Sequence, residues 1–309
     1  MEPRKPSRIL FVVLVIVVIA AAGAASALVY EFNKPKAPHP LLTVQEGDNI
    51  TVNYIGVFGS GGQAGRVFDT SFQSIATNNV TYPKSLEYEP RPSSGYTPLP
   101  VHVGPTTPQG GYVVGNLTFD SVVTGFWQGL LGLQGNQTAT IVVPPNLGYG
   151  PLNQSCIGTA PLSFTVPVLT NVAASRFSAQ YPGVNSTVGV VFLDPTYGWN
   201  DTVFSVNSTT VVVRSSASLG ESIHPNGLPF VVAALNATTI SVSSLLTPAN
   251  AGAVLGHVTS GGLCGSTYPL PFIVSAVNFA TGTYTMNFNP EVQGETLDFV
   301  VTVVDIFPA

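Results

Sequence analysis

Apolar and polar residues alternate in short runs along much of this 309-residue chain. The stretch "DNITVNYIGVF" places Ile50, Val52 and Tyr54 on one side of an extended segment, and "LDFVVTVVDIF" repeats the pattern near the C-terminus. A period of two is typical of a strand with one buried face. The chain also contains 31 glycines and 26 prolines, which favour turns. The pattern predicts a mainly β (α+β) protein built of short antiparallel strands.

One segment, Ser121 to Leu133 ("SVVTGFWQGLLGL"), has a helical period instead. Its apolar side chains recur at helical spacing, at Val122, Val123, Phe126, Leu130 and Leu133. We expect Asp120 or Ser121 to cap its N-terminus, and its glycines predict a short helix. No long helix is expected elsewhere that would support a helical bundle.

Strand–turn–strand units recur in the second half of the chain. "SVNSTTVVVRSS" from Ser205 and "ALNATTISVSS" from Ala234 read as two copies of one hairpin, and "AVNFATGTYTMNF" from Ala276 is a looser third copy. The glycine-rich "GSGGQAG" is also expected to be a hairpin loop. It has Ala64 where a phosphate-binding G-x-G-x-x-G ends, and no helix follows. The pattern leaves the role of residues 73–98 open.

The N-terminal segment from Ile9 to Tyr30 carries no charge and is long enough to span a bilayer. Arg4, Lys5 and Arg8 precede it, so the positive-inside rule places the rest of the chain outside the cell, as a single-pass protein of the cell membrane. The alternative is a cleaved signal peptide ending near Ala25-Ser26-Ala27, in which case the protein would be secreted.

Charged residues make up only 8% of the chain, against about 25% in ordinary soluble proteins. Nucleic-acid binding is excluded, because the bases beyond Lys36 are few and scattered: Arg66, Lys84, Arg91, Arg176 and Arg214. The four histidines have no metal-ligand spacing and no C-x-x-C occurs, so neither a zinc site nor a thioredoxin-like site is expected.

Two further features agree with export. Cys156 and Cys264 are the only cysteines, and in an oxidising compartment a single pair most simply forms one disulfide. Sequons for N-glycosylation are enriched and predict a glycoprotein, although a chain rich in Ser, Thr and Asn also makes them by chance. They begin at Asn49, Asn79, Asn116, Asn136, Asn153, Asn185, Asn200, Asn207 and Asn236.

Three separated blocks, in order, resemble one family. "VNYIGVF…GRVFDTSF", "VVTGFWQGLLGLQGNQTATIVVPPNLGYG" and "NPEVQGETLDFVVTVVDI" resemble the opening strands, the central helix with its following strand, and the final strand of FKBP-type peptidyl-prolyl isomerases. The long interval after Tyr149 resembles the insert-in-flap domain of the SlyD-like and archaeal long type, which holds unfolded chains. The resemblance implies an antiparallel sheet wrapped on one short helix, with an inserted β-rich domain.

The expected organisation follows from these features together. Residues 1–8 form a cytoplasmic tail, 9–30 the transmembrane helix and 31–45 a proline-rich tether. A split isomerase domain comprises residues 46–154 and 284–309, and residues 155–283 form the chaperone-like insert.

The resemblance also implies a proline-binding pocket. Carried over by position, the catalytic residues are Tyr54, Phe68, Asp69, Val122, Val123, Phe126, Tyr149 and Phe299, with Leu99 as a substrate-binding neighbour. Phe126 stands where many members have a tryptophan, and Trp127 is expected to face elsewhere. We expect Tyr149 to donate to the substrate carbonyl, and Asp69 either to hold Tyr54 or to meet the carbonyl carbon. No cofactor is implied.

We therefore expect a monomeric isomerase that assists the folding of exported or cell-surface proteins. Its substrates would be unfolded or partly folded polypeptides that contain proline. Two alternatives stay open: a surface holdase chaperone with a vestigial pocket, and a non-enzymatic cell-envelope module. A hydrolase is disfavoured, because no G-x-S-x-G is present.

Overall fold

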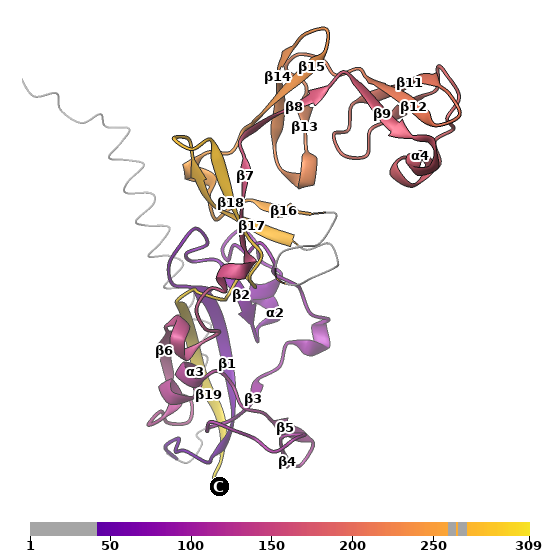
Figure 1. The fold of residues 1–309 in the computed structure, drawn as a ribbon. Helices are drawn as coiled ribbons and strands as arrows, with labels where there is room; N and C mark the ends of the chain where they lie inside the picture. The colour runs from indigo at the N-terminus through magenta and orange to yellow at the C-terminus, as the bar shows by residue number, and fades with distance from the viewer. Residues whose placement is uncertain (1–41, 259–263, 265–270) are drawn as a thin grey trace, which may run out of the picture. The chain divides into compact units, whose positions relative to one another are not determined.

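The computed structural model describes residues 42–258, 264 and 271–309. They form several antiparallel sheets and a few short helices, which confirms the prediction of a mainly β protein. The chain divides into two compact units (Figure 1). The first runs to Pro151 and resumes at Glu291–Ala309, and the second is Leu152–Pro290.

The first unit is built on a five-stranded antiparallel sheet of order β2-β1-β19-β6, with β3 also paired to β1. One edge of β1 pairs with β19 along its whole length, while the other edge pairs first with β3 and then with β2. The terminal strand β19 occupies the predicted residues. The strands are β1 (Asn49–Phe58), β2 (Val67–Thr70), β3 (Leu99–His102), β6 (Thr138–Val143) and β19 (Leu297–Phe307).

The alternation in β1 directs Ile50, Val52 and Tyr54 into the main core of this unit. Helix α3 (Thr124–Leu130) packs against β6 and adds Phe126 to the same core. The aromatic and β-branched side chains of the sheet thus meet one short helix, as the sequence predicted.

The other face of β1 is covered by the segment whose role the sequence left open. Ile55 of β1 is fully buried in a smaller cluster with Ile75 of helix α2 (Gln73–Ala76). Tyr88, which also lies in the segment 73–98, packs against that cluster. This segment is therefore part of the fold of the first unit and lies close to β2.

The central helix is shorter than predicted, and its expected N-cap is wrong. The helix begins after Val123, which has an extended backbone and no capping side chain. The helix lies very close to β6: a Cβ atom added to Gly129 would stand 2.3 Å from Ile141, and one added to Gly125 would stand 2.9 Å from Val143. The glycines therefore serve close packing, and Val122 and Val123 remain outside the helix.

Small elements complete the first unit. Strands β4 and β5 form a separate two-stranded hairpin. The bounds of the remaining elements are β4 (Tyr112–Val114), β5 (Leu117–Phe119), η1 (Ser93–Gly95) and η2 (Pro145–Leu147).

The second unit contains three four-stranded antiparallel sheets of the same plan. In each sheet a short strand precedes a hairpin, and the second hairpin strand pairs with one of three consecutive strands at the start of the unit. The first sheet joins β7 (Ile157–Pro161) to β16 (Leu255–His257), β17 (Pro271–Asn278) and β18 (Thr283–Asn287). The second joins β8 (Ser163–Pro167) to β13 (Ser222–Ile223), β14 (Phe230–Leu235) and β15 (Thr239–Ser244). The third joins β9 (Leu169–Ala173) to β10 (Val191–Leu193), β11 (Asn200–Val206) and β12 (Thr210–Ser215).

This pairing is nested, because the three starting strands pair with the later hairpins in reverse order. The last of them, β9, pairs with the first hairpin that follows, and the first, β7, pairs with the last hairpin. The three predicted repeats are the hairpins β11–β12, β14–β15 and β17–β18. Each hairpin has a register shift at the equivalent place, after Val203, Val232 and Val274. The repeats are confirmed as hairpins, but each belongs to its own sheet. The helical elements here are α4 (Ala174–Gln180), η3 (Gln154–Cys156), η4 (Pro225–Gly227) and η5 (Pro248–Asn250).

The bounds of the inserted unit differ from the expected 155–283. Residue 284 lies inside β18, which pairs with β7 and β17, so the first unit resumes only at Glu291. Cys156 and Cys264 both lie within the second unit and are joined by the expected disulfide.

The expected membrane segment from Ile9 to Tyr30 lies outside the described residues, as does most of the tether. Within the part of the chain that the structure describes, no helix is both long and apolar enough to cross a membrane.

Candidate active site

The first unit contains a cavity of about 520 Å³, a size usual for small-molecule sites. The nine side chains expected at a pocket all line it, and Ser121 joins them. The lining is Tyr54, Phe68, Asp69, Leu99, Ser121, Val122, Val123, Phe126, Tyr149 and Phe299. The structure therefore brings together residues spread over almost 250 positions of sequence, while their catalytic role remains a prediction.

Aromatic rings form the apolar wall of the cavity. The ring centroids of Phe126 and Phe299 lie 4.8 Å apart at 79°, and those of Phe68 and Phe299 lie 5.4 Å apart at 90°. Tyr54 meets Phe126 edge to face at 6.4 Å. These perpendicular arrangements are the favoured ones for aromatic pairs, so the rings hold one another in place.

Gly56 makes room for this wall. A Cβ atom added to Gly56 of β1 would stand 2.5 Å from the ring of Phe68, closer than real Cβ contacts. Gly56 is paired with Asp69 across the β1–β2 ladder, where the register shifts by a bulge. The glycine therefore lets the Phe68 ring lie across β1, next to the carboxylate of Asp69.

Val122 and Val123 enter the cavity from the extended segment before α3, rather than from a helical face as predicted. Trp127 does not line the cavity and is buried in the main core instead, as expected. Phe126 thus lines the cavity without its neighbour Trp127, and only 2% of its surface is exposed.

Asp69 is the centre of the polar side of the cavity. The Tyr54 hydroxyl donates a hydrogen bond to Oδ2 of Asp69. Oδ1 accepts from the Thr70 backbone N–H at 2.8 Å and from the Arg91 guanidinium at 3.0 Å. The expected contact between Asp69 and Tyr54 is therefore present, while contact of Asp69 with a substrate carbonyl carbon stays a prediction.

Arg91 is the residue that sequence reasoning missed. Its guanidinium also donates to the Thr70 carbonyl and lies 5.1 Å from the centre of the Tyr96 ring. Its backbone N–H donates to the Tyr96 hydroxyl at 2.9 Å. The one available signal was that an arginine is rare in this chain, and nothing local in the sequence pairs it with Asp69, 22 residues away.

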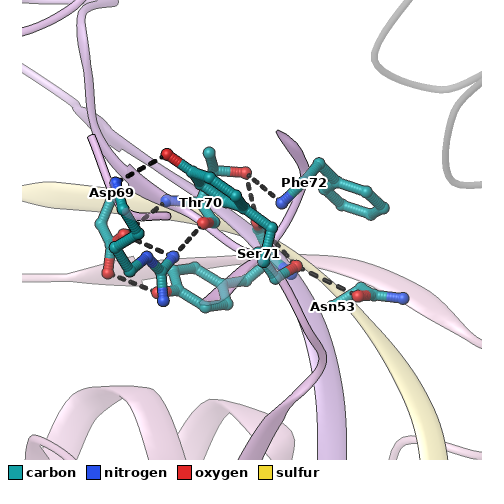
Figure 2. Close-up of polar contacts among 8 residues, drawn as sticks. Asn53, Asp69, Thr70, Ser71 and Phe72 are labelled. Atoms are coloured by element: carbon teal, nitrogen blue, oxygen red, sulfur yellow. Dashed lines mark hydrogen bonds and ion pairs between the residues drawn. The ribbon is translucent and has the colours of Figure 1, made fainter. Parts of the chain in front are cut away.

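Thr70 and Ser71 fix the end of β2 against β1 (Figure 2). Thr70 Oγ1 donates to the Tyr54 carbonyl at 2.9 Å, and Ser71 Oγ accepts from the Tyr54 N–H at 2.9 Å. Ser71 Oγ also donates to Asn53 Oδ1 at 3.1 Å, and Thr70 Oγ1 accepts from the Phe72 N–H. The backbone of Tyr54 is therefore tied to the same short segment that carries Asp69.

Tyr149 lines the cavity, is half-exposed and follows the turn η2. The turn is closed by Gly150, whose N–H donates to the Pro145 carbonyl and whose backbone has a φ of 84°. That conformation favours glycine. The loop thereby holds the half-exposed Tyr149 in the lining of the cavity.

Electrostatics keep both tyrosines protonated. Burial, and then the charge of Asp69, raise the pKa of Tyr54 far above its ordinary value, and the same two causes raise the pKa of Tyr149. Tyr54 is thus a donor to Asp69, and Tyr149 is available as a donor to a ligand. Among the described residues, no three His, Cys, Asp or Glu side chains come together to hold a metal ion.

These features define an antiparallel-sheet protein with an aromatic ligand cavity beside one short helix. No family model matches the chain. The chain is 27% identical over 118 residues to a short-type peptidyl-prolyl cis-trans isomerase from Methanocaldococcus jannaschii. The match covers 38% of this chain and 58% of that relative, so less than two thirds of the relative is spanned. It shows distant homology to an FKBP-type isomerase, and shows neither the insert nor the membrane anchor.

Proposed function

We propose that the protein is a peptidyl-prolyl cis-trans isomerase that binds proline-containing segments of unfolded or partly folded chains in the aromatic cavity. The observation that carries the proposal is the convergence of the phenylalanine wall, the Tyr54–Asp69 hydrogen bond and the Tyr149 hydroxyl on one cavity. The distant homology to an isomerase supports it.

The reaction needs no nucleophile, metal or cofactor. Rotation about a peptide bond costs about 18–20 kcal/mol because planarity gives the C–N bond double-bond character. Isomers of an X-Pro bond are nearly balanced yet exchange over tens to hundreds of seconds. A catalyst therefore has only to bind the twisted amide more tightly than either planar form.

The cavity offers that preference. The rings of Phe68, Phe126 and Phe299 would exclude water from the proline ring and its amide. A twisted amide has less charge separation than a planar one, so it loses less on leaving water. The Tyr149 hydroxyl would donate to the substrate carbonyl and orient it. Asp69, held in turn by Arg91, would keep Tyr54 in its place in the wall.

The test is the cis–trans exchange rate of an X-Pro peptide, followed by NMR exchange spectroscopy with the full chain in detergent. We expect the parent to accelerate exchange. Tyr149→Phe should lower the rate about two- to tenfold, the worth of one hydrogen bond, and Asp69→Ala should also lower it. Tyr112→Phe is the matched control, because Tyr112 is on β4 outside the cavity. A folded parent without activity would refute the proposal.

We further propose that the unit Leu152–Pro290 holds unfolded chains for the cavity. Supporting this, the unit exposes many large apolar side chains, among them Leu169, Val188, Val191, Leu193, Phe204, Leu219, Leu235, Leu245 and Phe279. If the pocket were vestigial, this holdase role would be the remaining function. Suppression of the aggregation of a proline-free unfolded protein measures it without any contribution from isomerisation.

We also propose that the chain is anchored by residues 9–30 with both units outside the cell. The charge pattern of the N-terminus and the Cys156–Cys264 disulfide support this, because disulfides persist in oxidising compartments. Protease added to intact cells should remove residues 42–309, whereas a cytoplasmic protein would be protected.

A further inference from the structure

Three hairpin tips of the second unit have the same local structure. At the β11–β12 tip, Asn207 Oδ1 accepts from the backbone N–H groups of Thr209 and Thr210, at 2.9 and 2.8 Å. At the β14–β15 tip, Asn236 Oδ1 accepts from Thr238 and Thr239, both at 2.8 Å.

The β17–β18 tip repeats this geometry. There Asn278 Oδ1 accepts from the N–H groups of Ala280 and Thr281, at 3.0 and 3.2 Å. In each tip the Oδ1 atom of the asparagine thus accepts the hydrogen bonds that close the turn. The amide nitrogen Nδ2 takes no part in these backbone hydrogen bonds.

The tips differ in one chemical respect. Thr209 and Thr238 stand two residues after their asparagines, and each Oγ1 donates to the asparagine Oδ1 at 3.1 Å. The third tip has Ala280 at that position and no such hydroxyl. The fold therefore provides two Asn-x-Thr tips and one equivalent tip without the hydroxyl.

Exposure separates the tips from two of the other sequons, those of Asn49 and Asn136. Asn207 and Asn236 are exposed, as are the two residues after each. Asn49, by contrast, lies in β1 between two partner strands, with Oδ1 3.0 Å from Nδ1 of His102. Asn136 has a buried Oδ1 in a left-handed turn. Of these four asparagines, only the two at the hairpin tips could carry a large substituent that extends freely into solvent.

We propose that Asn207 and Asn236 are acceptor sites for N-linked oligosaccharide, and that Asn278 is not. The inference rests on the proposed export of the chain. The donor is a lipid-phosphate-linked oligosaccharide: its C1–O bond to phosphate breaks, C1 bonds to Nδ2, one amide proton leaves and the lipid phosphate is released. Asn236 Nδ2 already donates one hydrogen bond to Thr239 Oγ1 at 2.7 Å, and the product keeps one N–H for that bond.

The modification would also cover apolar surface. Val206 and Leu235 immediately precede the two acceptors and are 41% and 40% exposed. Each pairs with its partner strand at the last rung before the tip. An oligosaccharide on the next residue would shield these side chains from other molecules.

The experiment is expression of the full chain in a secretory host that has oligosaccharyltransferase, with site mapping by mass spectrometry after enzymatic deglycosylation in ¹⁸O water. We expect modification at Asn207 and Asn236 and none at Asn278. Asn207→Gln and Asn236→Gln should each remove one oligosaccharide. Ala280→Thr should add one at Asn278, because it supplies the missing hydroxyl to the same turn.

A second form with a cleavable secretory signal in place of residues 1–30 separates this inference from the proposed anchor. If it is modified while the full chain is not, the inference stands and export by residues 9–30 fails. If Asn207 and Asn236 are unmodified in a chain whose Cys156–Cys264 disulfide has formed, the inference is wrong. An unmodified Asn278 in the Ala280→Thr chain would show that the shared turn is not an acceptor geometry.

Discussion

The inserted unit should lose stability as pH rises, because it buries two carboxyl groups together. The unit carries only five Asp, Glu, Lys or Arg residues: Arg176, Asp194, Asp201, Arg214 and Glu221. Asp194 and Asp201 are only 7% and 2% exposed. Burial, and then the charge of Asp194, raise the pKa of Asp201 from 3.8 to about 7.

The size and sign of the effect follow from proton linkage. Between pH 4 and 7 the folded unit keeps a proton on Asp201 that the unfolded chain has lost, so stability falls as pH rises. Above pH 7 the folded unit must carry the buried charge. A shift from 3.8 to about 7 corresponds to about 4 kcal/mol at 1.36 kcal/mol per unit. Asp201→Asn removes the carboxyl that titrates between the two pKa values and should remove this loss.

The assay uses the two tryptophans. Trp127 is in the first unit and Trp199 in the second, so Trp127→Phe leaves a reporter of the second unit alone. Trp199 is 1% exposed and stacks on Tyr197 at 4.5 Å, so its fluorescence should change on unfolding. Urea unfolding of this chain at pH 4, 6 and 8.5, with and without Asp201→Asn, gives the free energy of unfolding at each pH.

We expect Asp201→Asn to match the parent at pH 4 and to be more stable by up to about 4 kcal/mol at pH 8.5. Glu221→Gln is the control, because it removes an acid of the same unit outside the buried pair. Tyr181 and Tyr197 do not interfere, because burial and the two carboxylates raise their pKa values, that of Tyr181 to about 12. Equal stability of parent and Asp201→Asn at pH 8.5 would refute the reasoning.

Three further changes test the cavity and the Cys156–Cys264 disulfide. Gly56→Ala should lower the exchange rate by displacing the Phe68 ring, which a new Cβ would approach to 2.5 Å; an unchanged rate contradicts this. Arg91→Gln should lower kcat/KM for the peptide. It should change the free energy of unfolding by less than about 1 kcal/mol, because the Arg91–Asp69 ion pair is partly exposed. Arg91→Lys should retain part of the activity that Arg91→Gln loses. Cys156→Ser removes a disulfide that joins residues 108 positions apart. It should lower the free energy of unfolding of the second unit by about 2–5 kcal/mol, measured by Trp199 fluorescence. An unchanged free energy of unfolding would mean that the disulfide does not stabilise this unit.

The strands with a clear alternating pattern could be predicted closely from the sequence. The predicted run Leu297 to Phe307 is the strand β19, and the three repeated hairpins form where the turn residues Asn207, Asn236 and Asn278 stand. Period and turn chemistry act over a few residues, so they are visible in one stretch of chain. The members of the cavity were found through resemblance, because their common property is a place in the fold.

What the sequence determined is therefore the mainly β class, the positions of β1, β19 and the three repeated hairpins, and, through the family resemblance, the side chains that line the cavity. Only the tertiary structure decided where α3 begins and ends, the close approach of its Gly125 and Gly129 to β6, and the contact between Arg91 and Asp69. It also decided the nested pairing of β7, β8 and β9, and the joint burial of Asp194 and Asp201. These features depend on contacts between distant segments, which local period and propensity do not encode.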